Sequence, residues 1–140
     1  MNESDLNKYQ RYKHDLKLAL AALEEFNTSV YAPRALQLSP LPASHSTDTE
    51  RLSRALERLD KLRARADYLD RMVQASEELL LYVATLLETD IERDILVYHY
   101  YKGMKVDEAV KKIRCSRSTF YEHRTRILNT IAPITYLMPG

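Results

Sequence analysis

The sequence predicts an all-α protein with an N-terminal helix, a long helix of the coiled-coil type and a C-terminal group of short helices. Apolar residues recur seven positions apart over two long stretches, which is the repeat of a helix with one apolar stripe. Glycine is nearly absent, since the 140 residues contain only Gly103 and Gly140. Tight hairpins and phosphate-binding loops need glycine at positive φ or close to a ligand. We therefore expect neither a β-rich fold nor a nucleotide-binding loop.

Composition excludes several further classes of protein. A chain of 140 residues that is 45% hydrophobic is long enough to bury a core. The single cysteine, Cys115, excludes a disulfide framework, and the four histidines lack the spacing of a zinc site. No apolar run approaches the ~20 residues of a membrane span, and the polar N-terminus does not resemble a secretory signal. We expect a cytoplasmic protein that uses no metal or other cofactor.

The first helix is predicted over residues 4–26, and a linker follows over about 27–46. The linker is rich in serine and threonine and contains Pro33, Pro40 and Pro42. Because proline cannot continue a helix, this segment is predicted to be an extended loop. The two apolar rows of the first helix are Tyr9, Leu16 and Leu23, and Tyr12, Ala19 and Phe26.

The second helix is predicted to begin at a capping box formed by Thr47 and Glu50 and to run for about 60 Å. Its apolar stripe is flanked by charged residues of both signs, which predicts a solvated outer face. The stripe needs a covering partner, either the first helix folded back or a second copy of the chain, and we expect a homo-oligomer through this helix. The two rows are Leu52, Leu59, Ala66, Val73, Leu80 and Leu87, and Ala55, Leu62, Leu69, Ser76 and Val83.

Three shorter helices are predicted over the C-terminal part. Thr89 and Glu92 form a second capping box before a helix over 90–101, and Gly103 is placed to end that helix. A short helix over 106–113 follows, and Ser116 caps a last helix that runs to Ile131. We therefore divide the chain into a helical oligomerisation region, residues 1–88, and a C-terminal head, residues 89–140. The inward side of the last helix is predicted to be Phe120, Ile127, Leu128 and Ile131, with His123 or Arg124 at its edge.

Two helices of about 8 and 15 residues joined by a three-residue turn have the outline of a helix-turn-helix. In such motifs the N-terminal residues of the second helix contact base edges, while neighbouring cations hold phosphates. Arginine can donate two hydrogen bonds to guanine, and serine, threonine, glutamate or tyrosine can bind nearby edges or backbone. The candidate DNA-binding residues are Lys111, Lys112, Arg114, Ser116, Arg117, Ser118, Thr119, Tyr121, Glu122, Arg124 and Thr125.

The distribution of charge supports double-stranded DNA as a partner. Residues 1–90 contain 12 basic and 15 acidic side chains, whereas residues 91–140 contain 9 and 5, so net charges of −3 and +4 add up to the overall +1. Residues 102–126 alone contain eight basic and three acidic side chains. A local basic excess of this kind is typical of phosphate binding.

The C-terminal motifs also resemble a known family. The run Glu92-Arg93-Asp94-Ile95-Leu96, the run from Cys115 to Tyr121 and Arg126-Ile127-Leu128 resemble region 4 of sigma factors. They are most similar to the phage transcriptional regulators of the ArpU/RinA type. The resemblance covers about 40 residues and implies a DNA-binding activator of phage or prophage late genes in a bacterial host, with contact to RNA polymerase left open. Arg114 stands where the family often has glycine, and Val110 where it often has a small residue.

Other functions remain open at this point. A small terminase subunit would bind a packaging site through a similar head and assemble into a ring, whereas a coiled-coil adaptor would bind no DNA. An enzyme is not expected, because no nucleophile–base pair or carboxylate cluster has a usable spacing. Cys115 is interpreted as a packing residue, with a redox sensor as the alternative. Four tyrosines are interpreted as packing residues rather than base-stacking ones, namely Tyr82, Tyr98, Tyr100 and Tyr101.

Overall fold

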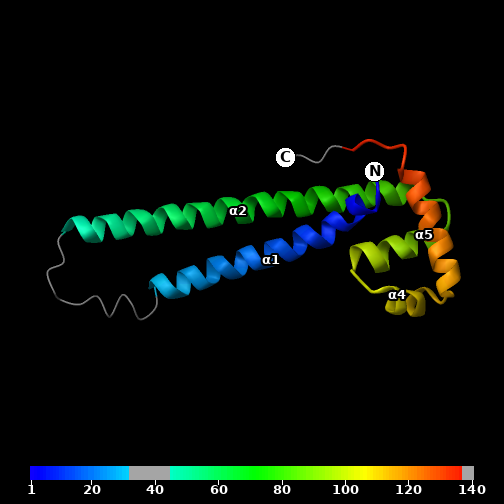
Figure 1. Ribbon diagram of the computed structural model, residues 1–140, viewed down its shortest axis with the longest axis horizontal. Coiled ribbons are helices and arrows are strands. Elements are labelled where there is room, and N and C mark those ends of the chain that lie inside the picture. The colour runs from blue at the N-terminus through cyan, green and yellow to red at the C-terminus, as the bar shows by residue number, and fades with distance from the viewer. Residues whose placement is uncertain (32–44, 137–140) are drawn as a thin grey trace. The chain divides into compact units, whose positions relative to one another are not determined.

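The computed structural model describes residues 1–31 and 45–136, which contain helices and no strand. The all-α fold class is therefore confirmed. Contacts group the chain into two units, of which one comprises Asp15–Asp70 and the other Met1–His14 with the described residues from Arg71 onward. The helices are α1 (Glu3–Tyr31), α2 (His45–Leu86), α3 (Asp90–Ile95), η1 (Leu96–Tyr101, a π-helix), α4 (Val106–Ile113) and α5 (Arg117–Ile131) (Figure 1).

Both long helices differ from their predicted bounds. Helix α1 continues to Tyr31. In its last turns the Thr28 hydroxyl donates to the Glu24 carbonyl at 2.9 Å, so this polar side chain has a hydrogen-bond partner inside the helix. Helix α2 begins at His45, so Thr47 is not its N-cap, and the capping box predicted with Glu50 is wrong. The predicted linker over 27–46 thus overlaps helix at both ends, and its central residues 32–44 lie outside the described residues.

The apolar stripes predicted for α1 and α2 are buried or half-buried in the Asp15–Asp70 unit, except at Leu52. Phe26, Leu59 and Ala66 are buried, and Arg58 lies over the Phe26 ring with its guanidinium carbon 5.9 Å from the ring centroid. Leu52, predicted in the same row as Leu59, is instead 62% exposed. The heptad repeat therefore places Leu52 on the stripe but does not ensure that a neighbour covers it.

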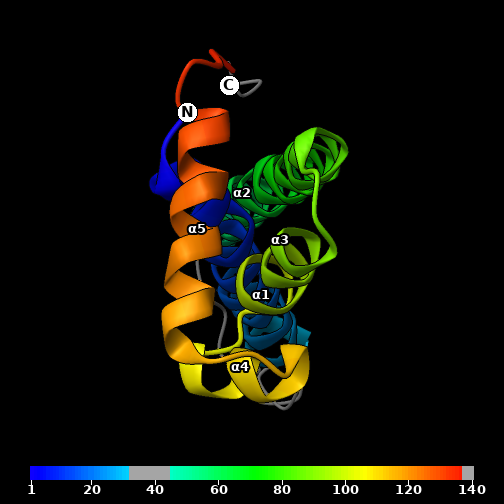
Figure 2. The same cartoon turned by 90° about the vertical axis from the view of Figure 1, so that its right-hand side faces the viewer.

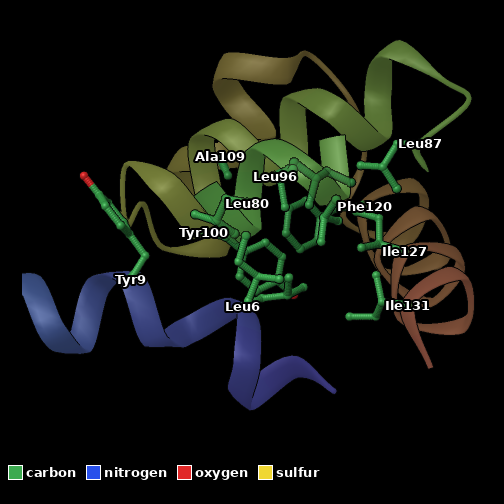
Figure 3. Packing of buried hydrophobic residues seen from close by; sticks show 13 residues of the cluster. Leu6, Tyr9, Leu80, Leu87, Leu96, Tyr100, Ala109, Phe120, Ile127 and Ile131 are labelled. Atoms are coloured by element: carbon green, nitrogen blue, oxygen red, sulfur yellow. The ribbon is translucent and has the colours of Figure 1, made fainter. Parts of the chain in front are cut away.

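The core of the other unit combines residues from six helices. Leu6 of α1 and Val83 of α2 have no exposed surface, and Tyr100 and Phe120 pack into the same cluster (Figure 3). Ile127 and Ile131 complete the buried side of α5, as predicted, while Leu128 is half-buried. The core that holds α5 therefore includes residues from both ends of the chain. Ser76, the polar residue in the α2 stripe, is also buried and donates to the Met72 carbonyl at 2.7 Å.

The junction between α2 and α3 is stabilised by a capping box, as predicted. The Glu92 backbone N–H donates to Thr89 Oγ1 at 3.3 Å, and the Thr89 N–H donates to Glu92 Oε2 at 3.4 Å. Arg93 adds a bond from its guanidinium to the Leu87 carbonyl at 2.9 Å, next to the last turn of α2. These bonds satisfy backbone groups that two helix ends would otherwise leave without partners.

The helix predicted over 90–101 changes type after Ile95. Over Leu96–Tyr101 it widens into a π-helix, and the Lys102 N–H bonds the Val97 carbonyl, five residues back, at 2.8 Å. Gly103 ends the segment with φ +73°, as predicted, and a Cβ there would lie 2.9 Å from the Gln10 side chain. The positive φ therefore favours glycine here, whereas the flexible end of the Gln10 side chain could move to admit a Cβ.

Removing the Phe120 ring tests this core. We expect Phe120→Ala to lower the free energy of unfolding by about 3–5 kcal/mol, because a fully buried ring leaves a cavity. The neighbouring Tyr121 is 44% exposed, so Tyr121→Ala should cost about 1 kcal/mol or less. Urea unfolding followed by circular dichroism measures both, and equal losses would contradict the described packing of α5.

Candidate nucleic-acid interface

Helices α4 and α5 form the helix-turn-helix outline with the predicted bounds. Helix α4 lies beside the N-terminal end of α5 (Figure 2). Ser116 is the N-cap of α5, since its Oγ accepts from the Thr119 N–H at 3.1 Å and donates to Thr119 Oγ1 at 2.9 Å. Two of the candidate DNA-binding residues, Ser116 and Thr119, thus hold the start of the helix in place.

The turn between the two helices depends on the conformation of Arg114. Its φ of 62° and ψ of 47° lie in the left-handed region, where an L side chain is strained and glycine is not. Its backbone N–H still bonds the Val110 carbonyl at 2.9 Å, as does that of Cys115 at 3.2 Å. Arginine therefore adopts the geometry that glycine would adopt at this position, and its side chain is exposed.

The outer side of α5 is polar and exposed over its first three turns. Ser118, Tyr121 and Thr125 follow one another at helical spacing, and all three are exposed. Thr125 Oγ1 donates to the Tyr121 carbonyl at 2.9 Å, so its hydroxyl is engaged by its own helix. Glu122 is also exposed and accepts from Arg126 at 3.1 Å. Because the apolar side of α5 packs into the core, its polar side faces solvent and is accessible to a ligand.

Basic side chains border this surface. Lys111 and Lys112 at the end of α4 are exposed, and within the described chain neither they nor Arg114 form an ion pair. Arg117, the first residue of α5, instead donates to Asp107 of α4. Both partners are more than 60% exposed, so water and salt screen this pair and either residue can exchange its partner easily.

Arg124 differs from the other candidates because it faces the start of α1. Its guanidinium donates to Glu3 Oε2 at 3.1 Å, and Glu3 Oε1 accepts from the Tyr100 hydroxyl at 3.0 Å. Burial and the negative charge of Glu3 raise the pKa of Tyr100, so the hydroxyl stays protonated as a donor. Sequence reasoning missed Glu3, which stands 121 positions before Arg124 and carries no motif. Arg124 is thus half-buried and tied to α1, while its guanidinium also lies over the Tyr121 ring.

Two histidines near this helix contact other residues of the same unit. His123 lies on the inner edge of α5, as predicted, with Nδ1 3.5 Å from Glu92 Oε1 and without a hydrogen bond. His99 bonds the Met104 carbonyl at 2.7 Å and packs edge-on against Phe120. Neither histidine is part of a metal cluster, since no group of three or more potential metal ligands occurs among the residues that the structure describes.

Cys115 and the tyrosines lie mostly in packing positions. Burial raises the pKa of the Cys115 thiol, which is opposite to the lowering that a redox sensor requires. Tyr100 is fully buried, and Tyr101 stacks on Tyr9 with ring centroids 4.9 Å apart. Tyr82 is 46% exposed on α2.

Comparison of the chain with protein families, with characterised proteins and with solved structures gave no match. The resemblance to sigma-factor region 4 and to phage regulators therefore stays a prediction based on short motifs. Among residues 1–31 and 45–136, no helix combines the length and apolar character needed to cross a membrane.

Replacing Arg114 tests the turn. Arg114→Gly should raise the free energy of unfolding by about 0.5–1 kcal/mol, because relief of left-handed strain exceeds the entropy that glycine adds to the unfolded chain. Arg114→Val should lower it by about 1 kcal/mol or more, since a β-branched residue fits positive φ poorly. Urea unfolding gives both values, and a Gly variant less stable than the Val variant would rule out this turn geometry.

Proposed function

We propose that the protein is a sequence-specific DNA-binding transcriptional regulator with α4 and α5 as its helix-turn-helix. The observation that carries this proposal is the division of α5 into two faces. Phe120, Ile127 and Ile131 hold one face in the core, and the other presents Arg117, Ser118 and neighbouring polar residues to solvent. A polar, exposed second helix with a fixed inner face is what docking into a major groove requires.

Each residue type fits a part of such a complex. Arg117, Ser118 and Tyr121 lie on the first turns of α5 and are proposed to contact base edges. Lys111, Lys112 and Arg114 have no ion pair within the described chain and are proposed to bind phosphates on either side of the groove.

Asp107 gives Arg117 a partner that DNA has to displace. A phosphate near Arg117 would meet the carboxylate of Asp107 as well, so non-specific binding gains little from this arginine. A guanine edge accepts two hydrogen bonds from a guanidinium and can compensate for the lost ion pair. We propose that Asp107 raises the discrimination of the site rather than its overall affinity.

The function includes self-association through α2. Leu52, Leu56 and Leu81 are 62%, 49% and 63% exposed, so α2 retains apolar surface that a second copy could cover. A dimer would place two heads on two half-sites of an operator. In line with the resemblance described above, the proposed role is control of phage or prophage late genes in the cytoplasm of a bacterial host.

Selection of DNA from a random pool, with footprinting and a measurement of oligomeric mass, tests this function. An enriched motif with two spaced half-sites and a dimeric or tetrameric mass is expected. A ring of eight or more copies on a packaging site would favour the terminase alternative instead. Failure to bind any duplex at low salt would contradict DNA binding altogether and favour the adaptor.

Substitutions of Arg117 and Asp107 are expected to change DNA binding in opposite directions. Arg117→Ala should weaken binding to the selected site by about 1–3 kcal/mol and relax specificity at one base pair. Asp107→Asn should strengthen binding to random DNA and steepen the salt dependence by about 0.9 in log–log slope, because Arg117 can then neutralise one more phosphate.

Fluorescence anisotropy with the selected duplex and with a scrambled duplex measures both effects. Asn129→Ala, at an exposed position of α5 that is not among the proposed contacts, serves as a control that keeps the charge of the surface. If Arg117→Ala weakened binding to both duplexes equally, Arg117 would not be a base-contacting residue.

A further inference from the structure

A row of positive charge runs along the N-terminal half of α2, outside the helix-turn-helix. Its members are spaced 3, 4, 3 and 4 residues apart, which places them on one face of an α-helix. All of them are exposed, whereas Leu59 and Ala66 of the same segment are buried. We call this row the basic stripe, and it consists of Arg51, Arg54, Arg58, Lys61 and Arg65.

The charge of this segment is not balanced locally. Residues 51–65 contain six basic and two acidic side chains, a net charge of +4, whereas residues 74–90 contain four acidic side chains and no basic one. Within the described residues 48–65 no acidic and basic side chains form an ion pair. Arg58 is engaged by the Phe26 ring, but the other four cations have no such ring contact. A helix that keeps exposed, like-charged side chains on one face bears a repulsion that an anionic ligand would relieve.

We propose that the basic stripe binds the phosphodiester backbone of double-stranded DNA, as a second contact outside α4 and α5. The proposal rests on the proposed function, which supplies the DNA. Four of the five cations are arginines, whose planar fork binds phosphate oxygens with two hydrogen bonds. The stripe spans about 21 Å at 1.5 Å per residue, comparable to the axial rise of about six phosphates on one strand.

An acidic helix of a second copy fits the stripe less well than DNA does. Its source would be residues 74–90, where Glu77 and Glu78 are adjacent and Glu88 follows ten positions later. These carboxylates do not repeat at the 3–4 spacing of the stripe, and Glu77 already accepts from the Tyr101 hydroxyl at 3.4 Å. Pairing two such helices would leave most stripe cations without partners, whereas a DNA strand offers evenly spaced anions.

The test compares the salt dependence of DNA binding in two variants of the full chain. The stripe variant is Arg54→Gln/Lys61→Gln/Arg65→Gln, which leaves Arg58 on the Phe26 ring. The control is Arg11→Gln/Lys13→Gln/Lys17→Gln, which removes the same charge from exposed positions of α1. Circular dichroism and thermal unfolding establish that both variants retain the fold, and the probe is the duplex selected above together with a scrambled one.

Loss of three phosphate contacts should make the log–log salt slope shallower by about 2.7 in the stripe variant. The factor by which affinity falls between 50 and 200 mM salt should then be about 40 times smaller for the stripe variant than for the original chain. Binding to both duplexes should change equally, because phosphates carry no sequence information. The control should keep a slope within about 0.5 of the original.

Three results would overturn the proposal. These are an unchanged slope in the stripe variant, an equal change in the control, and a fall in oligomeric mass without a change in slope, which would assign the stripe to a protein partner. If DNA binding persists while the stripe variant behaves like the control, only this inference fails and the helix-turn-helix function stands. If no duplex binds the original chain, the proposed function fails first and the inference fails with it.

Discussion

The structure depends most on the burial of one face of α5. Phe120, Ile127 and Ile131 have no exposed surface, and Leu6 from the start of the chain joins them in the same cluster. A short helix with few good helix formers would not be stable alone, so packing rather than propensity holds it. Because this face is fixed, the rotation of α5 about its axis is fixed too. The direction in which Arg117 and Tyr121 point follows from apolar contacts on the other side of the helix.

Polar contacts around this core also fix the position of α5. Glu3 accepts from both Tyr100 and Arg124, and the N-terminal amine bonds the Ile134 carbonyl at 2.5 Å. The first residues of α1 thus hold both η1 and α5. The candidate interface is therefore not built by residues 89–140 alone, since its geometry also depends on side chains in the first turns of α1. Such a link gives the interface rigidity that a free pair of short helices would lack.

The short helices could be predicted from sequence more accurately than the long ones. Ser116 and the Thr89–Glu92 pair mark helix starts by side-chain chemistry, and Gly103 marks an end by its backbone freedom. The end of α1 has no comparable signal, because a threonine hydroxyl can donate to a backbone carbonyl four residues back within the helix, as Thr28 does. Threonine after Phe26 therefore does not mark a helix end. Exposure also escaped prediction, since the repeat that contains Leu52 says where an apolar face lies but not what covers it. Glu3 and Arg124 meet only through tertiary packing, which no local pattern encodes.

The π-helix over Leu96–Tyr101 has a consequence for how this sequence should be compared with others. A turn closed five residues back contains one residue more than an α-helical turn. Residues after it are rotated by about 100° relative to the phase set by α3. A relative with an ordinary α-helix at this place would be one residue shorter there and would still bury the equivalents of Ile95 and Phe120. A correct alignment would therefore open a single-residue gap between Leu96 and Tyr101, and an ungapped one would match Tyr100 to an outward-facing position.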